Sequence, residues 1–366
     1  MEREIAPEIT FLSNFSWSNP NVLELLCETA SFSNFQVRHI SKPISFLKKK
    51  RKLEMDSAIM GIESKNLFNF STRSSSLPYL NSLQNHFLWK QIQSKCNKTN
   101  KRILFYNNLD SLAGLRDKFK EHFDLLIYLC ADYSELNERL LLNCHIADII
   151  FVIPPSMHEI LQEKFPKKRI VLWPQPVTSA FHSPLDENQK VKIDLALSEI
   201  PEPRLIYAGQ GIDRLDNTIY HFIANRFSSC SLISFGGNNF RQDNNVFEIP
   251  PVSKQEMLYI ISQCQVGFMP YDISDSHNLH CVPLKLFDYF SAGLPVVSSK
   301  LINITNYKEL LFLCETFDEF ESGIEKSLVE EIDSELRKKR KNVYLSHSTR
   351  EMSDEFKSLI SKLVNF

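Results

Sequence analysis

Residues 283–297 read Pro-Leu-Lys-Leu-Phe-Asp-Tyr-Phe-Ser-Ala-Gly-Leu-Pro-Val-Val. The first nine residues predict a helix, Gly293 predicts its left-handed end, and the apolar residues that follow predict a buried strand. Lys285 lies near the start of the predicted helix, and Asp288 lies three residues later on the same face. A helix N-terminus and a lysine can bind phosphate oxygens, and a carboxylate can accept hydrogen bonds from ribose hydroxyls. An ordinary solvated Lys/Asp pair is the alternative interpretation.

The pattern of strand, turn and helix recurs on both sides of this stretch. Residues 204–211 form an apolar run that ends at Gly209 and Gly211, and residues 231–237 repeat it. Other short apolar runs predict strands at 8–13, 35–40, 102–106, 124–130, 147–153, 246–249 and 266–270. Ser156 and Ser253 are predicted N-caps of helices. Two successive series of βα units predict an α/β protein with two Rossmann-like, doubly wound domains.

Polar residues 174–198 resemble a linker between the two series. We therefore expect a first domain at 1–175 and a second at 176–349, which suits a chain of 366 residues. In doubly wound sheets, ligands bind at the carboxyl ends of the strands. The expected ligand site is then a central cleft that both domains face.

The composition excludes several classes of protein. Residues 1–170 carry 23 Lys and Arg against 18 Asp and Glu, a surplus too small to predict nucleic-acid binding. The eight cysteines form no Cys-x-x-Cys pair, which favours a reducing compartment and no zinc. His277 and His280 lie three residues apart, but no third metal ligand accompanies them. We expect no metal site and no required cofactor.

The location of the protein is predicted from its apolar segments. The N-terminus lacks a signal-peptide core, and no window approaches the roughly 18 apolar residues of a membrane span. We therefore expect a cytoplasmic protein. Residues 44–52 combine an apolar stretch with five consecutive basic residues. This segment is either a peripheral contact with anionic lipid at the inner face of the plasma membrane or a solvated loop.

With its neighbouring landmarks, the 283–297 segment resembles the nucleotide-sugar signature of GT-B glycosyltransferases. It is most similar to bacterial enzymes of capsule, teichuronic-acid and exopolysaccharide synthesis, including the xanthan-type glucuronosyltransferases. Four further landmarks occur in the family's order, at 147–156, 172–184, 207–216 and 266–271. The resemblance spans roughly residues 124–300, and it implies a GT-B fold whose C-terminal helix, 350–366, packs back on the first domain.

The resemblance also implies roles for residues of the second domain. Lys285 would bind the donor diphosphate, and Asp288, where the family usually has Glu, would accept from ribose hydroxyls. Arg214 would face the phosphates or pair with Asp216. The remaining residues expected at the donor are Gly209, Gly211, Tyr271, Pro283 and Leu284. Because Lys285 and helix N-termini can neutralise the leaving diphosphate, we expect transfer without a metal ion.

The predicted first domain offers Asp132 as the best candidate catalytic base, with Glu135 and Asp110 as weaker alternatives. Asp132 follows the apolar run 124–130, so it should lie at the carboxyl end of a buried strand. A base is needed to take the proton of the acceptor hydroxyl as it attacks the anomeric carbon, and in xanthan-type enzymes an aspartate in a similar position has this role. The alternative is that Asp132 caps a helix that starts near Ser134.

The sequence therefore predicts a glycosyltransferase that moves a sugar from a nucleotide sugar, with UDP as the expected nucleotide. The acceptor would be a saccharide or a lipid-linked glycan in surface polysaccharide or glycoconjugate synthesis. A sugar-nucleotide 2-epimerase shares the fold and is one alternative. A non-catalytic homologue that binds glycans or partners is the other.

Overall fold

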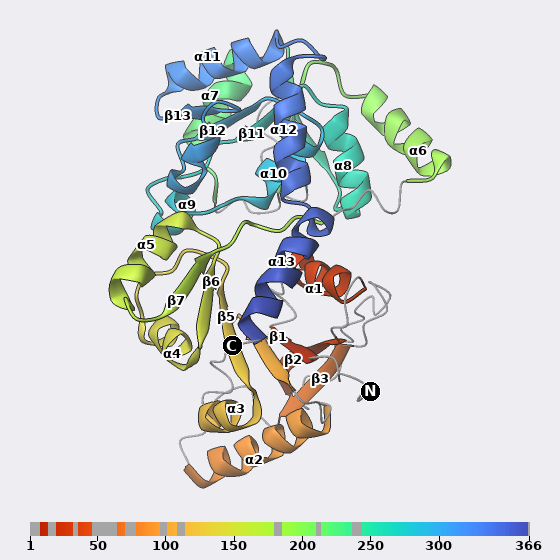
Figure 1. Cartoon of the computed structure of the whole chain (residues 1–366). Helices are drawn as coiled ribbons and strands as arrows, with labels where there is room; N and C mark the ends of the chain where they lie inside the picture. The colour runs from red at the N-terminus through yellow and green to blue at the C-terminus, as the bar shows by residue number, and fades with distance from the viewer. Residues whose placement is uncertain are drawn as a thin grey trace. The chain divides into compact units, whose positions relative to one another are not determined.

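The structure is a computed structural model that describes residues 8–13, 20–31, 36–45, 64–69, 78–95, 101–107, 114–178, 185–209, 214–235 and 244–364. The chain divides into two compact units (Figure 1). Unit 1 contains Met1–Thr178 and Thr349–Phe366, and unit 2 contains Ser179–Ser348. Both units are built on a parallel sheet with helices on its faces.

Unit 1 has a seven-stranded sheet in the order β3-β2-β1-β4-β5-β6-β7. Every neighbouring pair is parallel, and the order reverses between β1 and β4. The strands are β1 (Glu8–Ser13), β2 (Gln36–Ser45), β3 (Ser64–Asn69), β4 (Arg102–Tyr106), β5 (Leu125–Cys130), β6 (Ile149–Val152) and β7 (Arg169–Leu172). The helices are α1 (Pro20–Ser31), α2 (Pro78–Lys95), α3 (Arg116–His122), α4 (Glu138–Ile146), α5 (Pro155–Lys164) and α13 (Thr349–Val364).

Alternating side chains of β4 enter two different cores. Leu104 and Tyr106 belong to the core that includes residues of α2, α3, α4 and α5. Ile103 and Phe105 belong to the core that includes residues of α1 and α13. Because successive side chains of a strand point to opposite faces, both faces of the sheet are buried, as a parallel sheet requires.

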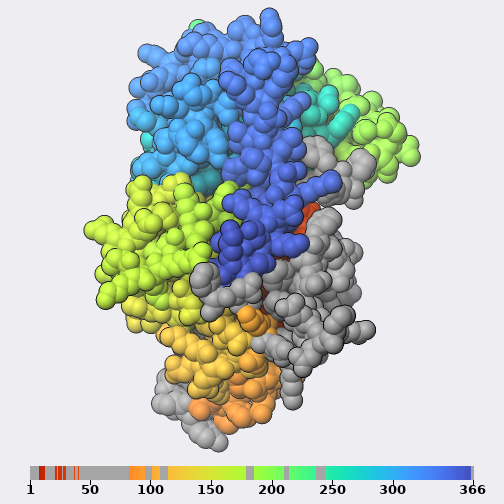
Figure 2. All heavy atoms as spheres, in the orientation of Figure 1, coloured from red at the N-terminus to blue at the C-terminus, as the bar shows by residue number. Residues whose placement is uncertain are grey.

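The C-terminal helix α13 is part of unit 1. Its apolar residues Met352, Phe356 and Ile360 recur at a helical spacing and are buried. The Phe356 ring lies 5.4 Å from Trp173 and 6.2 Å from Phe105, measured between ring centroids. Figure 2 shows α13, in dark blue, on the surface of this unit.

Unit 2 has a six-stranded parallel sheet in the order β10-β9-β8-β11-β12-β13, which reverses between β8 and β11. The strands are β8 (Arg204–Tyr207), β9 (Ser231–Phe235), β10 (Val246–Ile249), β11 (Val266–Met269), β12 (Val296–Ser299) and β13 (Phe312–Cys314). The helices are α6 (Glu187–Ser198), α7 (Asn217–Arg226), α8 (Lys254–Ser262), α9 (Ser276–Leu279), α10 (Leu284–Ser291), α11 (Phe317–Leu328) and α12 (Glu335–Ser346), with a 3₁₀ segment at Ile302–Tyr307. The predicted α/β class and doubly wound sheets are confirmed.

Several local predictions are also confirmed. Gly293 has a positive φ of 75° and follows the last turn of α10. Ser253 caps α8 in a reciprocal capping box with Glu256. The six cysteines whose side chains are described are free and buried. No helix in the described part of the chain is both long and apolar enough to cross a membrane.

Other local predictions are wrong. The expected linker 174–198 contains α6, because Asp186 and Gln189 form a capping box and Asp194 accepts a hydrogen bond from Tyr259. Ser156 does not cap α5, since that helix already begins at Pro155. Strand β3 was not among the predicted strands, and its pairing with β2 forms it. Of the basic segment 44–52, residues 46–52 lie outside the described residues.

Candidate functional site

The candidate site lies at the reversal point of the unit 2 sheet, where the chain leaves β8 and β11. The loops that follow these two strands pair with each other. Leu215 forms an antiparallel bridge with Tyr271, and the backbone N–H groups of Asp216 and Asp272 donate to the carbonyls of Pro270 and Arg214. This pairing brings side chains from distant parts of the sequence to one edge of the sheet.

Lys285, the second residue of α10, points into this edge. Its Nζ lies 3.8 Å from the ring centroid of Tyr207 and 5.0 Å from that of Tyr271. The Lys285 residue is half-buried, and the ammonium is its enclosed end. Burial and the nearby Arg214 guanidinium lower the pKa of this ammonium to about 7.

Gly209 provides the space that the ammonium occupies. A Cβ at this position would lie 2.6 Å from Nζ of Lys285 and 2.9 Å from the hydroxyl of Tyr207. A side chain at this position would displace the ammonium or the Tyr207 hydroxyl, so the glycine leaves room for both. Gly211, the other glycine expected here, lies outside the described residues.

Arg214 supplies a second positive charge on the same aromatic ring. Its Cζ lies 5.6 Å from the ring centroid of Tyr271, and its Nε donates to Oδ1 of Asn278 at 2.8 Å. Its Nη2 is buried and has no hydrogen-bond partner. The predicted alternative, an Arg214–Asp216 pair, is wrong, because the Asp216 carboxylate accepts from backbone N–H groups at the start of α7.

Lys285 and Arg214 repel each other, because in the described part of the chain no carboxylate pairs with either of them to balance their charges. Within the described residues, no carboxylate forms an ion pair with Lys285 or Arg214, although both approach the Tyr271 ring. Two like charges in a partly buried site repel each other, and an anion between them would relieve the repulsion. The arrangement therefore suits a phosphate or diphosphate group.

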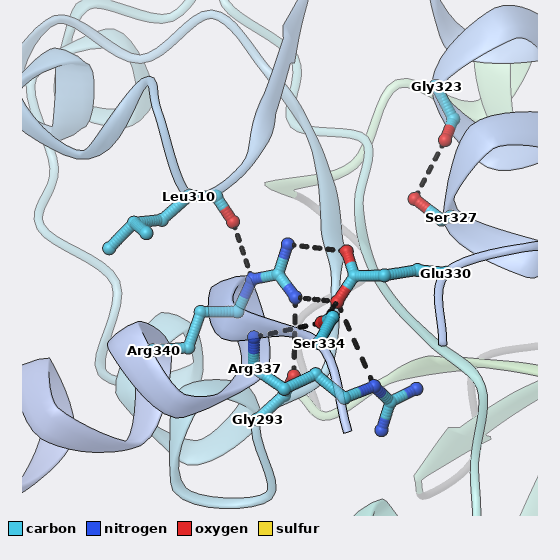
Figure 3. A network of polar contacts seen from close by, with 8 residues as sticks. All are labelled: Gly293, Leu310, Gly323, Ser327, Glu330, Ser334, Arg337 and Arg340. Carbon is cyan, nitrogen blue, oxygen red and sulfur yellow. Dashed lines mark hydrogen bonds and ion pairs between the residues drawn. The ribbon is translucent and has the colours of Figure 1, made fainter. Parts of the chain in front are cut away.

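The placement of α10 depends on two further contacts. At its centre, the hydroxyl of buried Tyr289 accepts a hydrogen bond from the backbone N–H of Ala208, at 2.7 Å. At its end, buried Arg340 of α12 donates to the carbonyls of Gly293 and Leu310 and forms two hydrogen bonds with Glu330 (Figure 3). These contacts set the position of the helix that carries Lys285.

The remaining predicted donor residues also lie on or beside α10. Pro283 precedes the helix in an extended conformation, and Leu284 is its first residue, with 37% of its surface exposed. Asp288 is buried, and its Oδ1 accepts from Nζ of Lys254 at 2.5 Å. Sequence reasoning missed Lys254, Tyr207 and Asn278, because only the tertiary structure brings them to these partners.

Asp132, the predicted base, lies in unit 1. It is exposed and follows β5 by two residues, at the carboxyl end of that strand. Helix α4 begins at Glu138 and is capped by Asn137, so the alternative prediction that Asp132 caps this helix is wrong. No hydrogen bond or ion pair to the Asp132 carboxylate is formed by the residues that the structure describes.

Comparisons with solved structures agree with this arrangement of strands. The chain is similar to Anabaena HepE, crystallised in complex with UDP and glucose, with a TM-score of 0.70 at 11% identity over 97% of this chain and 99% of that one. It is similar to the N-terminal domain of Candida albicans trehalose-6-phosphate phosphatase, with a TM-score of 0.70 at 11% identity over 98% and 97%. The chain has the GT-B fold.

The GT-B fold includes enzymes of more than one class. UDP-GlcNAc 2-epimerase from Neisseria meningitidis, solved with UDP-GlcNAc, matches with a TM-score of 0.63 at 12% identity over 97% of this chain and 100% of that one. At the level of sequence, no family model matches the chain and no curated protein gives a significant match. The likeness at these identities shows the fold.

Proposed function

We propose that the protein is a glycosyltransferase that uses a nucleotide sugar, with UDP as the nucleotide, and that unit 2 binds this donor. The convergence of Lys285 and Arg214 on Tyr271 at the reversal point of the sheet carries the proposal. Two cations without a carboxylate partner among the described residues match the charge of a diphosphate. Their place at the carboxyl ends of β8 and β11 is where doubly wound sheets bind nucleotides.

In the proposed reaction, an acceptor hydroxyl attacks the anomeric carbon of the donor sugar. The new bond joins the acceptor oxygen to this carbon, and the bond to the diphosphate oxygen breaks. The diphosphate leaves with the bonding electrons, and Lys285 and Arg214 stabilise its charge. Unit 1 would bind the acceptor, either a saccharide or a lipid-linked glycan. Its residue Asp132 takes the proton of the attacking hydroxyl. The proposed step uses no metal ion, because Lys285 and Arg214 supply the positive charge that the leaving diphosphate needs.

The donor assignment is tested first by thermal unfolding with UDP, GDP, ADP and CMP. A nucleotide present at 100 times its Kd stabilises the folded protein by about 2.7 kcal/mol. We expect UDP to raise the melting temperature most. The absence of a shift with all four nucleotides would contradict a nucleotide site in unit 2.

Lys285→Ala is expected to weaken UDP binding by roughly 10- to 100-fold, because a hydrogen bond to a charged group contributes about 1.5–3 kcal/mol. Isothermal titration calorimetry would measure the change in Kd. Lys338→Ala is a matched control, since Lys338 is an exposed lysine of α12 that pairs with its helix neighbour Glu335. Equal affinities for wild type and Lys285→Ala would remove Lys285 from the donor site.

UDP binding is also expected to weaken as the pH rises from 7 to 9. The pKa of Lys285 is about 7 in the free protein, so its amine is largely neutral at pH 9 and must take up a proton when the diphosphate binds. UDP itself contributes little in this range, because the second pKa of a phosphate is about 6.

Calorimetry in buffers of different ionisation enthalpy would measure the proton uptake. Lys285→Arg supplies the control, since a guanidinium stays protonated throughout this range. The pH effect should be absent in that variant. A wild-type affinity that does not change between pH 7 and 9 would show that Lys285 is already protonated or is not at the diphosphate.

A 2-epimerase is the second candidate, because the similarity to the Neisseria enzyme extends over the full chain. An epimerase converts its sugar nucleotide without an acceptor, whereas a transferase releases UDP when an acceptor is present. Incubating UDP-sugars with the protein alone, and analysing the sugar nucleotides by chromatography, separates the two. Conversion to an epimer in the absence of acceptor would favour the epimerase.

A further inference from the structure

A second pair of charges lies one helical turn beyond Lys285 on α10. Lys254, the first residue of α8, donates from Nζ to Oδ1 of Asp288 at 2.5 Å. The Asp288 side chain is 8% exposed and that of Lys254 is 38% exposed. The carboxylate therefore lies inside the protein, and the ammonium reaches it from the more open side.

In the part of the chain that the structure describes, the Lys254–Asp288 pair still has both free donors and free acceptors of hydrogen bonds. A carboxylate has about four acceptor positions and an ammonium has three donors, and their mutual hydrogen bond uses one of each. Within the described residues, the Asp288 carboxylate and the Lys254 ammonium have no other hydrogen-bond partner. The pair can accordingly accept one hydrogen bond and donate another to the same ligand.

The two cations and the neutral pair lie in the same order as the parts of a nucleoside diphosphate. Arg214 follows β8, Lys285 lies in the first turn of α10, and both approach the Tyr271 ring, so they suit an anion. Asp288 lies one turn further along α10, Lys254 reaches it from the start of α8, and together they are neutral. A nucleoside diphosphate has the same order, a charged diphosphate followed by a neutral ribose whose hydroxyls both donate and accept hydrogen bonds.

We propose that Lys254 is a specificity residue for the nucleoside of the donor, and that it binds the ribose hydroxyls together with Asp288. This inference rests on the proposed function of unit 2. Asp288 accepts from one hydroxyl, and the ammonium of Lys254 donates to a hydroxyl oxygen. Asp288 alone was predicted from the sequence. Because its side chain is buried and paired, we infer that the two residues recognise the ribose as a unit.

Three probes separate the ribose from the diphosphate: UDP, 2′-deoxy-UDP and inorganic pyrophosphate. Calorimetry would give the Kd of each for wild type, Lys254→Ala and Lys254→Arg. We expect Lys254→Ala to weaken UDP binding by about tenfold, equivalent to about 1.4 kcal/mol. Its affinity for pyrophosphate should stay within about twofold of wild type, and the preference for UDP over 2′-deoxy-UDP should largely disappear. Lys254→Arg preserves the ion pair and should retain most of that preference.

The outcomes that overturn the inference are distinct from those that overturn the proposed function. Unchanged UDP binding by Lys254→Ala would overturn the inference alone. Equal losses of UDP and pyrophosphate affinity would also do so, because Lys254 would then act as a phosphate cation or through the fold. The melting temperatures of the unliganded variants separate these two roles. A wild-type protein that binds neither UDP nor pyrophosphate would overturn the proposed function itself.

Discussion

Asp132→Asn is expected to reduce sugar transfer by about 10²- to 10⁴-fold and to leave UDP binding unchanged. The carboxylate lies exposed at the carboxyl end of β5 and caps no helix, so it is available to an acceptor. Asparagine keeps the size and polarity of the side chain but cannot take a proton at neutral pH. The expected loss is therefore in the chemical step.

The rate of UDP release from a UDP-sugar would be measured for wild type and variant. Both proteins receive the same acceptor preparation, either a saccharide or a lipid extract. Calorimetry with UDP checks that unit 2 is unaffected. Glu135→Gln is the informative comparison, because Glu135 is also exposed and lies three residues further along. Full transfer by Asp132→Asn would exclude Asp132 as the base, and a loss confined to Glu135→Gln would assign the role to Glu135.

Glu330→Ala is expected to lower the free energy of unfolding of unit 2 by about 3–5 kcal/mol, because it leaves a buried guanidinium without its counter-charge. Arg340 is 1% exposed, and its Nη1 and Nη2 lie 2.6 and 2.9 Å from the Glu330 carboxylate. Ser334, which caps α12, also donates to Glu330 (Figure 3). The loss would loosen the end of α10 as well, since Arg340 donates to the carbonyl of Gly293.

Urea unfolding of wild type and Glu330→Ala, followed by circular dichroism, would measure this loss. Glu335→Ala is the matched control, because Glu335 pairs with Lys338 on the exposed surface of α12 and should contribute less than about 1 kcal/mol. Similar effects of the two substitutions would show that the Arg340–Glu330 pair contributes little to the stability of the unit.

The pair also predicts how stability changes with pH. Burial would raise the pKa of Glu330, but its hydrogen bond and ion pair with Arg340 outweigh burial and lower it. A lowered carboxyl pKa contributes stability above the unfolded value, near 4.3, and the contribution is lost as the pH falls through the folded value. The difference in stability between wild type and Glu330→Ala should therefore shrink under acid conditions.

The local sequence was sufficient to predict much of the fold. Apolar runs and glycine turns predicted most strands, because parallel strands are covered on both faces and leave a continuous apolar signal. The predictions failed where the signal comes from elsewhere. Helix α6 has a single buried side chain, Leu197, so its apolar pattern is weak, and β3 depends on its pairing with β2.

The candidate donor site shows the same division. By itself, the sequence determined that Lys285 and Asp288 share one face of a helix next to a glycine turn, since both facts follow from helical periodicity. Only the tertiary structure decided what these side chains meet. Lys285 lies over the ring of Tyr207 and near Arg214, and Asp288 forms an ion pair with Lys254. These partners come from other strands and helices, and a parallel sheet brings them together because its carboxyl-end loops gather at one edge.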